Sequence, residues 1–430
     1  MLKALLLSIL IQGVLMSAVL DKIEINGIEI PIIFEKSETL PIVSMQIVFQ
    51  KSGSIEDTID GLAKFSSKML NQGTKTLGNV AFAQKLEERA IHLATNCGTE
   101  TMVIQISSLK EEFPYGIELL SELLKEPNLT EEAFEKVKTT TLGFLSRKEN
   151  DYDYIAGVNL KKTLFENTPI GHPSNGTVES IKRLKLQDVK EFLQKHLVLK
   201  RAILVIGGDL DLRQAKEFAK KALQPLPAGS IEPLPFFEAS KAQKTVTVQK
   251  ETEQAYIYFG APFYMRVESD ELYLAKVASF ILGSGGFGSR MMEEIRVKRG
   301  LAYSAYSRFN VNRSHSYFSG YLQTKLDSAQ EAIKLVKELV GEFIEKGATQ
   351  AELEAAVKFL TGSEPLRAET LSQRLSRAFN EYYRGHKLGY SKKELELIKK
   401  IDLDTLNRFI KKHSEIELMT FSIVTDKGDR

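Results

Sequence analysis

The segment LQDVKEFLQKH at residues 186–196 is followed by a short apolar run at 202–206, and LDTLNRFIKKH at residues 403–413 is followed by a similar run at 418–424. In each segment apolar residues recur at helical spacing, so both predict an amphipathic helix that leads into a buried strand. The second segment begins 217 residues after the first (403 minus 186), which is about half of the 430-residue chain. This repeat indicates an internal duplication.

Other features occur in the same order in both halves. Alternating β-prone residues come first, then a helix rich in small apolar residues, and later a long charged helix. Strands group together with helices clustered between them, which favours an α+β fold over a doubly wound one. We therefore expect two duplicated domains, each a mostly antiparallel sheet with helices packed on one face. The paired segments are 44–50 with 255–261, 62–70 with 271–282, and 130–148 with 349–360.

A proline-rich stretch separates the halves. Residues 224–237 read QPLPAGSIEPLPFF and contain four of the twelve prolines of the chain. Proline lacks a backbone N–H and disfavours both helix and central strand, so the stretch predicts an extended linker. The expected division is a signal-like segment at 1–18, an N-terminal domain at 19–223, the linker at 224–245 and a C-terminal domain at 246–430.

Charge and cysteine content narrow the classes of function. The 58 Lys and Arg residues nearly balance the 56 Asp and Glu residues, which leaves a formal net charge of +2. Composition therefore offers no case for a nucleic-acid partner. The one cysteine, Cys97, cannot form an intramolecular disulfide or supply a zinc ribbon.

The N-terminus resembles a signal peptide. Lys3 supplies a short positive region, residues 4–15 are mainly apolar, and small residues end at Ala18, which suits cleavage after that residue. We expect an exported chain, in the periplasm of a Gram-negative bacterium, that begins near Val19 and has no transmembrane span in its mature form. The alternatives are an anchor formed by the uncleaved N-terminus, or a buried first strand or helix of a cytoplasmic protein.

Two groups of residues resemble one known family. Residues 53–56 and 61–74 are similar to the first-domain helix of the inverted zinc peptidases related to pitrilysin, insulinase and the mitochondrial processing peptidase. The glycine-rich stretch 282–290 and the sequence EIRVKRGLAYS at 294–304 are similar to the C-terminal domain of the same family. The resemblance covers nearly all of the mature chain, including the duplication and the linker.

The family's catalytic motif is degenerate here. In the family, two histidines of an H-x-x-E-H motif hold zinc and the glutamate activates the bound water. The matching residues are Lys64-Phe65-Ser66-Ser67-Lys68. A protonated lysine has no lone pair, and Ser67 has no carboxylate. We therefore expect no metal in this chain.

The family's third zinc ligand, a glutamate, is also missing. The best matching stretch, residues 139–144, has no carboxylate before Glu149. No two of the six histidines lie three or four residues apart, so we expect ordinary surface or core histidines. Two hypotheses remain for Lys64 and Lys68: a solvated helix face without a role, or charges that orient an acidic group across an inner cavity.

Arg296 and Tyr303 match a pair to which the resemblance assigns a role. In the family, an arginine and a tyrosine seven residues apart reach from the C-terminal domain to the zinc domain. There the arginine holds the substrate and the tyrosine hydrogen-bonds the developing oxyanion. Without the family, the two residues would be a helix-end arginine and a strand tyrosine.

Three glycines, Gly283, Gly285 and Gly286, mark a further candidate. The resemblance makes them a flexible loop beside the substrate chamber, and the alternative is a helix C-cap and turn. The stretch lacks the Gly-Lys-Ser/Thr ending of a P-loop and the G-x-G-x-x-G register of a dinucleotide site, so nucleotide binding is not expected.

The resemblance implies a site that is split between two chains. In heterodimeric members one subunit carries zinc and a partner supplies the arginine–tyrosine pair, so we expect a non-zinc-binding subunit that binds peptides together with a related zinc-bearing subunit. Alone it should be inactive. One alternative is an inert scaffold or peptide-binding protein of the same fold, like the family's relatives in a respiratory complex. The other is an active zinc peptidase with unrelated ligands.

Overall fold

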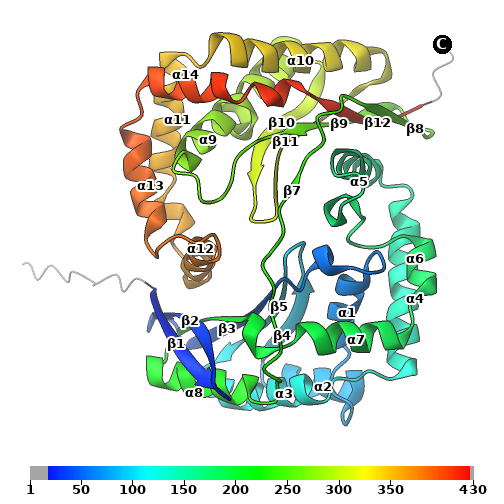
Figure 1. Cartoon of the computed structure of the whole chain (residues 1–430), viewed down its shortest axis with the longest axis vertical. Helices are drawn as coiled ribbons and strands as arrows, with labels where there is room; N and C mark the ends of the chain where they lie inside the picture. Colours follow the sequence, from blue (N-terminus) through cyan, green and yellow to red (C-terminus); the bar gives the residue numbers. More distant parts are fainter. Residues whose placement is uncertain (1–17, 427–430) are drawn as a thin grey trace, which may run out of the picture.

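The computed structural model describes residues 18–426, and the signal-like segment expected at 1–18 lies outside this range except for Ala18. The chain forms two six-stranded sheets, one from each half of the sequence (Figure 1). Within the described part of the chain, no helix is both long and apolar enough to cross a membrane. The α+β class predicted from the sequence is confirmed.

The first sheet has the order β1-β2-β6-β3-β5-β4. β2 and β6 pair in parallel, and the other neighbours are antiparallel. Every residue of β6 is buried, because the strand lies between β2 and β3 with helices on both faces. The elements of this half are β1 (Val19–Ile25), β2 (Ile28–Lys36), β3 (Ile42–Gln50), α1 (Leu62–Leu70), α2 (Gly78–Glu87), β4 (His92–Cys97), β5 (Thr101–Leu109), α3 (Phe113–Lys125), α4 (Glu131–Lys148), α5 (Tyr152–Leu164), α6 (Val178–Arg183), α7 (Leu186–His196), β6 (Ala202–Gly208) and α8 (Leu212–Leu223).

The second sheet has the order β10-β11-β9-β12-β8, and the short strand β7 also pairs with β11. β12 and β8 are parallel, whereas β9, β11 and β10 form an antiparallel series. The elements of this half are β7 (Phe237–Glu238), β8 (Thr245–Gln249), β9 (Gln254–Pro262), α9 (Leu272–Ser279), β10 (Ala302–Val311), β11 (His315–Lys325), α10 (Ala329–Lys346), α11 (Gln350–Gly362), α12 (Leu371–Tyr383), α13 (Tyr390–Lys399), α14 (Leu403–Lys412) and β12 (Thr420–Thr425).

The two sheets repeat one topology. The strand order β2-β6-β3-β5-β4 of the first sheet corresponds to β8-β12-β9-β11-β10 of the second, and in each the first pair is the parallel one. The two repeated segments form α7 with β6 in the first half and α14 with β12 in the second. The predicted duplication is therefore confirmed by the topology.

Helices cover the outer face of each sheet, and one helix from the opposite half covers part of each inner face (Figure 1). On the first sheet, Leu375 of α12 packs into a cluster with Val205 of β6. On the second sheet, Leu160 and Leu164 of α5 pack into a cluster with Tyr317 of β11. α5 and α12 occupy equivalent places in the two repeats, so each half depends on the other for a layer of its core.

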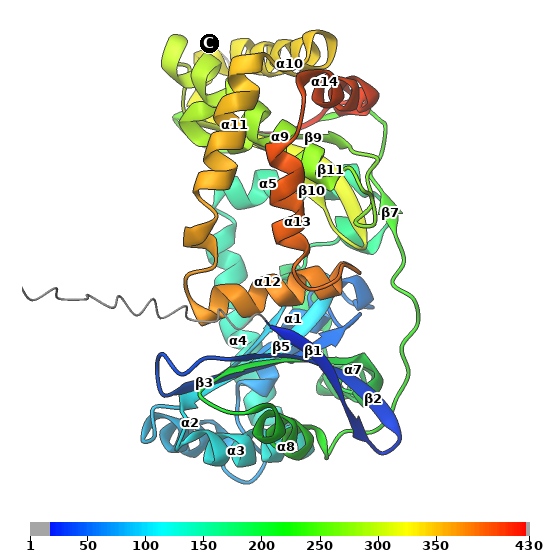
Figure 2. The same cartoon turned by 90° about the vertical axis from the view of Figure 1, so that its left-hand side faces the viewer.

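Two connections bear on the arrangement of the strands. Residues 227–236 run extended along one side of the molecule before β7 pairs with β11 (Figure 2). The stretch 23–34 contains two strands, because Asn26 and Gly27 have φ angles of 51° and 75° and reverse the chain in a tight hairpin.

Candidate functional site

The helix that matches the family's zinc helix, α1, is held at its start by a buried carboxylate. Asp57 accepts hydrogen bonds from the backbone N–H groups of Gly61 (3.0 Å) and Ala63 (2.7 Å). These groups have no partner inside the helix, so the carboxylate stabilises its first turn. Burial raises the pKa of Asp57 to about 7 despite these two bonds.

Lys64 and Lys68 lie one turn apart on α1 and are half-buried. Lys64 Nζ donates to Asn175 Oδ1 at 3.0 Å, and Lys68 Nζ donates to Thr141 Oγ1 of α4 at 3.1 Å. Thr141 belongs to the stretch 139–144 in which the third ligand was expected, so the fold brings the two stretches compared with the family's zinc site into contact. Burial lowers the pKa of Lys68, and the neighbouring charge of Lys64 lowers it further. Both ammonium groups thus donate hydrogen bonds to neutral oxygen atoms.

Ser67, at the position of the family's general base, faces the interior. Its side chain is buried, its hydroxyl donates to the carbonyl of Lys64 at 2.9 Å, and its own carbonyl accepts a hydrogen bond from Thr95. A hydroxyl that donates its hydrogen bond to its own helix backbone cannot act as the general base that activates water. Among residues 18–426 no three His, Cys, Asp or Glu side chains are grouped so that they could hold a metal ion.

Arg296 and Tyr303 lie in direct contact. The Arg296 guanidinium is 4.5 Å from the ring centroid of Tyr303 and 4.8 Å from that of Phe287, so it sits between two aromatic rings. Tyr303 is 80% exposed and Phe287 is 66% exposed, which leaves this group open to solvent. Arg296 belongs to a wide π-helical segment, Met292–Lys298, a geometry often found at functional sites.

A β-bulge sets the position of Tyr303. Ala302 pairs with Thr324 and Ala305 with Leu322, so two residues of β10 face the single residue Gln323. A bulge of this kind redirects side chains at the end of a strand. No hydrogen bond or ion pair within residues 18–426 joins Tyr303 or its neighbour Arg296 to the lysines of α1.

The three glycines differ in how much room the surrounding structure leaves for a side chain. A Cβ atom on Gly283 would lie 2.0 Å from Ser307 Oγ and 2.5 Å from its backbone nitrogen, so close packing against β10 excludes any side chain there. A Cβ on Gly285 would lie 2.7 Å from the Phe280 carbonyl oxygen, whereas Gly286 has a φ of +60° and open space around it. The residues form helical turns that end beside Arg296 and Phe287.

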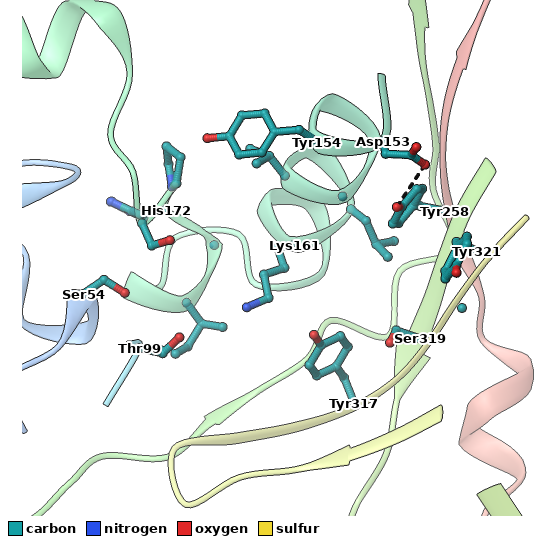
Figure 3. Close-up of a pocket in the computed structure, with 18 of the residues that line it drawn as sticks. Ser54, Thr99, Asp153, Tyr154, Lys161, His172, Tyr258, Tyr317, Ser319 and Tyr321 are labelled. Atoms are coloured by element: carbon teal, nitrogen blue, oxygen red, sulfur yellow. Dashed lines mark hydrogen bonds between the residues drawn. The ribbon is translucent and has the colours of Figure 1, made fainter. Parts of the chain in front are cut away.

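A cavity of about 530 Å³ lies between the two sheets and is lined by residues of both halves (Figure 3). Its wall on β9, β10 and β11 is rich in tyrosine, and Lys161 projects into it from α5. Sequence reasoning missed this wall. The alternation along β9 to β11 marks one face of each strand, but it does not reveal that this face meets a helix from the other half. The wall tyrosines are Tyr258, Tyr306, Tyr317 and Tyr321.

Asp153 of α5 ties the helix to this wall. Its carboxylate accepts a hydrogen bond from the hydroxyl of Tyr258 at 3.2 Å and another from the amide of Gln323 at 2.8 Å. Burial, followed by the charge of Asp153, raises the pKa of Tyr258. Gln323 also lies opposite the bulge that carries Tyr303.

Comparisons with known proteins agree with this architecture. Family models match the insulinase family (peptidase family M16) over residues 32–178 and the peptidase M16 inactive domain over residues 183–360. A Helicobacter pylori protein (strain ATCC 700392 / 26695) named non-peptidase homolog YmxG is 46% identical over 422 residues, which cover 97% of this chain and 98% of its own. The Saccharomyces cerevisiae mitochondrial-processing peptidase subunit beta is 24% identical over 200 residues, 44% of this chain and 43% of its own.

A solved structure gives the same result for the fold. The peptidase M16 inactive domain from Pseudomonas fluorescens superposes with a TM-score of 0.87 at 22% identity, covering 95% of this chain and 98% of that one. The family predicted from the degenerate motif and the stretch around Arg296 is confirmed. The chain belongs to the insulinase family, peptidase family M16.

Proposed function

We propose that this chain is a zinc-free subunit of a peptidase complex. It binds peptide in the cavity between its sheets and presents Arg296 and Tyr303 to a related subunit that carries the H-x-x-E-H motif. The observation that carries this proposal is the contrast between helix α1 and the exposed group around Arg296 and Tyr303. On α1, the positions that we match to the family's metal ligands carry Lys64 and Lys68, whereas Tyr303 is 80% exposed beside an arginine that has no ion-pair partner among residues 18–426.

The geometry suits a role in binding peptide. A guanidinium between two rings keeps its donor N–H groups at the edge, where they can meet peptide carbonyls. A phenol at the next strand end supplies one more donor. The non-peptidase name of the Helicobacter pylori relative and the subunit name of the yeast relative support, respectively, a chain that is inactive alone and a chain that works in a complex.

A reconstitution experiment tests the proposal. The tagged chain is purified from its native host, and a co-purifying protein with an H-x-x-E-H motif is mixed with it while cleavage of a quenched fluorescent peptide is followed. We expect little cleavage by the chain alone and an increase on mixing. Tyr303→Phe should then lower kcat roughly 10²-fold, as loss of an oxyanion donor does, and Arg296→Ala should raise KM.

The control is Arg299→Ala, three residues from Arg296, because Arg299 is ion-paired to Glu294 at 2.7 Å and lies outside the proposed site. Full activity of the mixture with Arg296→Ala or Tyr303→Phe would favour the scaffold alternative. Zinc-dependent cleavage by the purified chain alone would overturn the proposal, and metal analysis of that preparation would identify an atypical zinc site.

We also propose that the chain is exported to the periplasm. The first strand, β1, begins at Val19, directly after the expected cleavage position, so a chain that begins at Val19 keeps every residue of β1 that pairs with β2. Mass spectrometry of the N-terminal peptide from the native host tests this proposal. A mature N-terminus near Val19 is expected, and an intact Met1 in a protein of the cytoplasmic fraction would contradict export.

A further inference from the structure

Two cations that line the cavity, the half-buried Lys161 and the exposed Arg308, lack a counter-charge. Lys161 of α5 and Arg308 of β10 border both the cavity of about 530 Å³ and an adjoining cavity of about 390 Å³. Neither side chain has a hydrogen-bond or ion-pair partner within residues 18–426. Figure 3 shows the Lys161 side chain directed toward Tyr317 and Thr99, two further residues shared by both cavities.

The acidic groups that line these cavities are already engaged. Asp153 accepts hydrogen bonds from Tyr258 and Gln323. Glu100 accepts hydrogen bonds from the backbone N–H of Ser314 at 2.8 Å and from its hydroxyl at 2.6 Å. Neither carboxylate therefore forms a pair with the two cations.

The environment of Lys161 is electrostatically unfavourable as it stands. Burial lowers the pKa of Lys161, and the charges of Arg308 and Lys64 lower it further. Half-buried charges are normally paired, so the unpaired Lys161 and the like charge of Arg308 at the same cavity indicate a place for an anion.

The rest of the cavity suits the body of a peptide. The rings of Tyr258 and Tyr321 stack at 5.5 Å between centroids, and Tyr306 lies 6.0 Å from Tyr321. Such a wall offers apolar ring faces and hydroxyl donors side by side. The volume falls in the range of roughly 300–1,000 Å³ that is typical of ligand pockets.

We propose that the cavity selects acidic peptides, with a carboxylate of the bound peptide held between Lys161 and Arg308. This inference rests on the proposed peptide-binding function and specifies its substrate class. The carboxylate could belong to a glutamate or aspartate side chain or to the peptide C-terminus, since both present the same two oxygens to a guanidinium and an ammonium.

Three fluorescein-labelled mixtures of ten-residue peptides test the inference by anisotropy with the full chain. All are random sequences of uncharged residues, apart from the single changes named next. One ends in an amide, the second has the same ending and one central glutamate, and the third has a free C-terminal carboxylate. We expect the second, the third or both to bind about tenfold or more tightly than the first, and the stronger one identifies the source of the carboxylate.

Variants assign the preference to the two cations. Lys161→Met and Arg308→Gln should each abolish it while leaving the affinity for the neutral mixture unchanged, and Lys161→Arg should retain it. The control is Lys162→Met, which changes the exposed neighbour of Lys161 on α5. Circular dichroism checks that each variant is folded. If Lys161→Met does not fold, the result for Arg308→Gln decides whether the cations cause the preference.

The possible failures are distinct. Equal affinity for all three mixtures would overturn the acidic selectivity and leave the proposed peptide-binding function standing. A preference that survives in both variants would place the anion site elsewhere and overturn the assignment to Lys161 and Arg308. Absence of binding by every mixture would overturn both the inference and the function on which it rests.

Discussion

The exchange of α5 and α12 predicts that a substitution in one half will destabilise the sheet of the other. Leu375 of α12 is 6% exposed and packs into a cluster with Ile33, Ile203 and Val205 of the first sheet. Leu375→Ala removes most of that contact. Truncation of a buried leucine costs about 3 kcal/mol where the cavity does not collapse, which makes local opening roughly 150 times more frequent.

Native-state hydrogen exchange, read by mass spectrometry, measures this effect. In Leu375→Ala, amides of β6 should exchange faster, and those of β9 in the second sheet should change less. Leu360→Ala is the matched control, because Leu360 of α11 is 5% exposed and belongs to the core of the second half. It should affect β9 more than β6. Faster exchange of β9 with unchanged β6 in Leu375→Ala would refute the reasoning, since α12 would then stabilise only its own half.

Three further predictions follow from the described contacts. Cleavage at a protease site inserted after Ser230 in the linker should leave both halves in one peak on size exclusion, because α5 and α12 each pack on the opposite sheet; two separate peaks would contradict this. In the native state Asp57 keeps its proton up to about pH 7, whereas in the unfolded chain it loses the proton near pH 3.8. The free energy of unfolding should therefore fall as the pH rises from about 4 to 7, by up to about 1.4 kcal/mol per pH unit. Urea titrations should show this slope in the wild type and a smaller one in Asp57→Asn. Cys97 is buried, and burial raises its pKa to about 12. Iodoacetamide at pH 8 should therefore modify this thiol on the order of 10³ times more slowly in the native state than in urea. Comparable rates would show that the thiol is accessible.

Elements with a strong local pattern could be predicted from the sequence. The helix expected at 62–70 is α1, and the strand expected at 44–50 is most of β3. The repeated helix and strand pairs are α7 with β6 and α14 with β12. In these segments the apolar period itself encodes which side is buried, so local reasoning suffices. The position of the domain boundary stays a prediction, because the two halves share helices.

The exchanged helices could not be predicted in the same way. α5 has only a weak apolar face, with Ala156, Leu160 and Leu164 buried, and nothing in that pattern says which sheet it covers. α12 buries Leu375, Ala378 and the charged Glu381, whose carboxylate accepts backbone hydrogen bonds at the start of α13. Each of these helices packs on a sheet that is distant in the sequence. The three-dimensional fold determines this contact, and a single sequence carries no local signal for it.

The candidate site was predicted unevenly for a similar reason. The resemblance to the family singled out Arg296 and Tyr303, because the stretch 294–304 that carries it is continuous in the sequence, and their role stays a prediction. Lys161 and Arg308 are 147 positions apart (308 minus 161) and meet only because α5 crosses to the second sheet. Neither lies in a pattern that local reasoning singles out. The fold alone places these two charges at one cavity.

Introducing the family's zinc ligands tests whether α1 and α4 have the geometry of a metal site. Lys64→His, Ser67→Glu and Lys68→His together restore the H-x-x-E-H motif but supply only two metal ligands. Because Lys68 Nζ reaches Thr141 Oγ1 at 3.1 Å, Thr141→Glu should place a third ligand at the same point. Competition with a chromophoric zinc chelator should show tighter zinc binding by the fourfold variant, by at least about tenfold or 1.4 kcal/mol. Equal affinity of the threefold and fourfold variants would mean that residue 141 does not face the former ligand positions, and the contact between Lys68 and Thr141 would then be no remnant of a metal site.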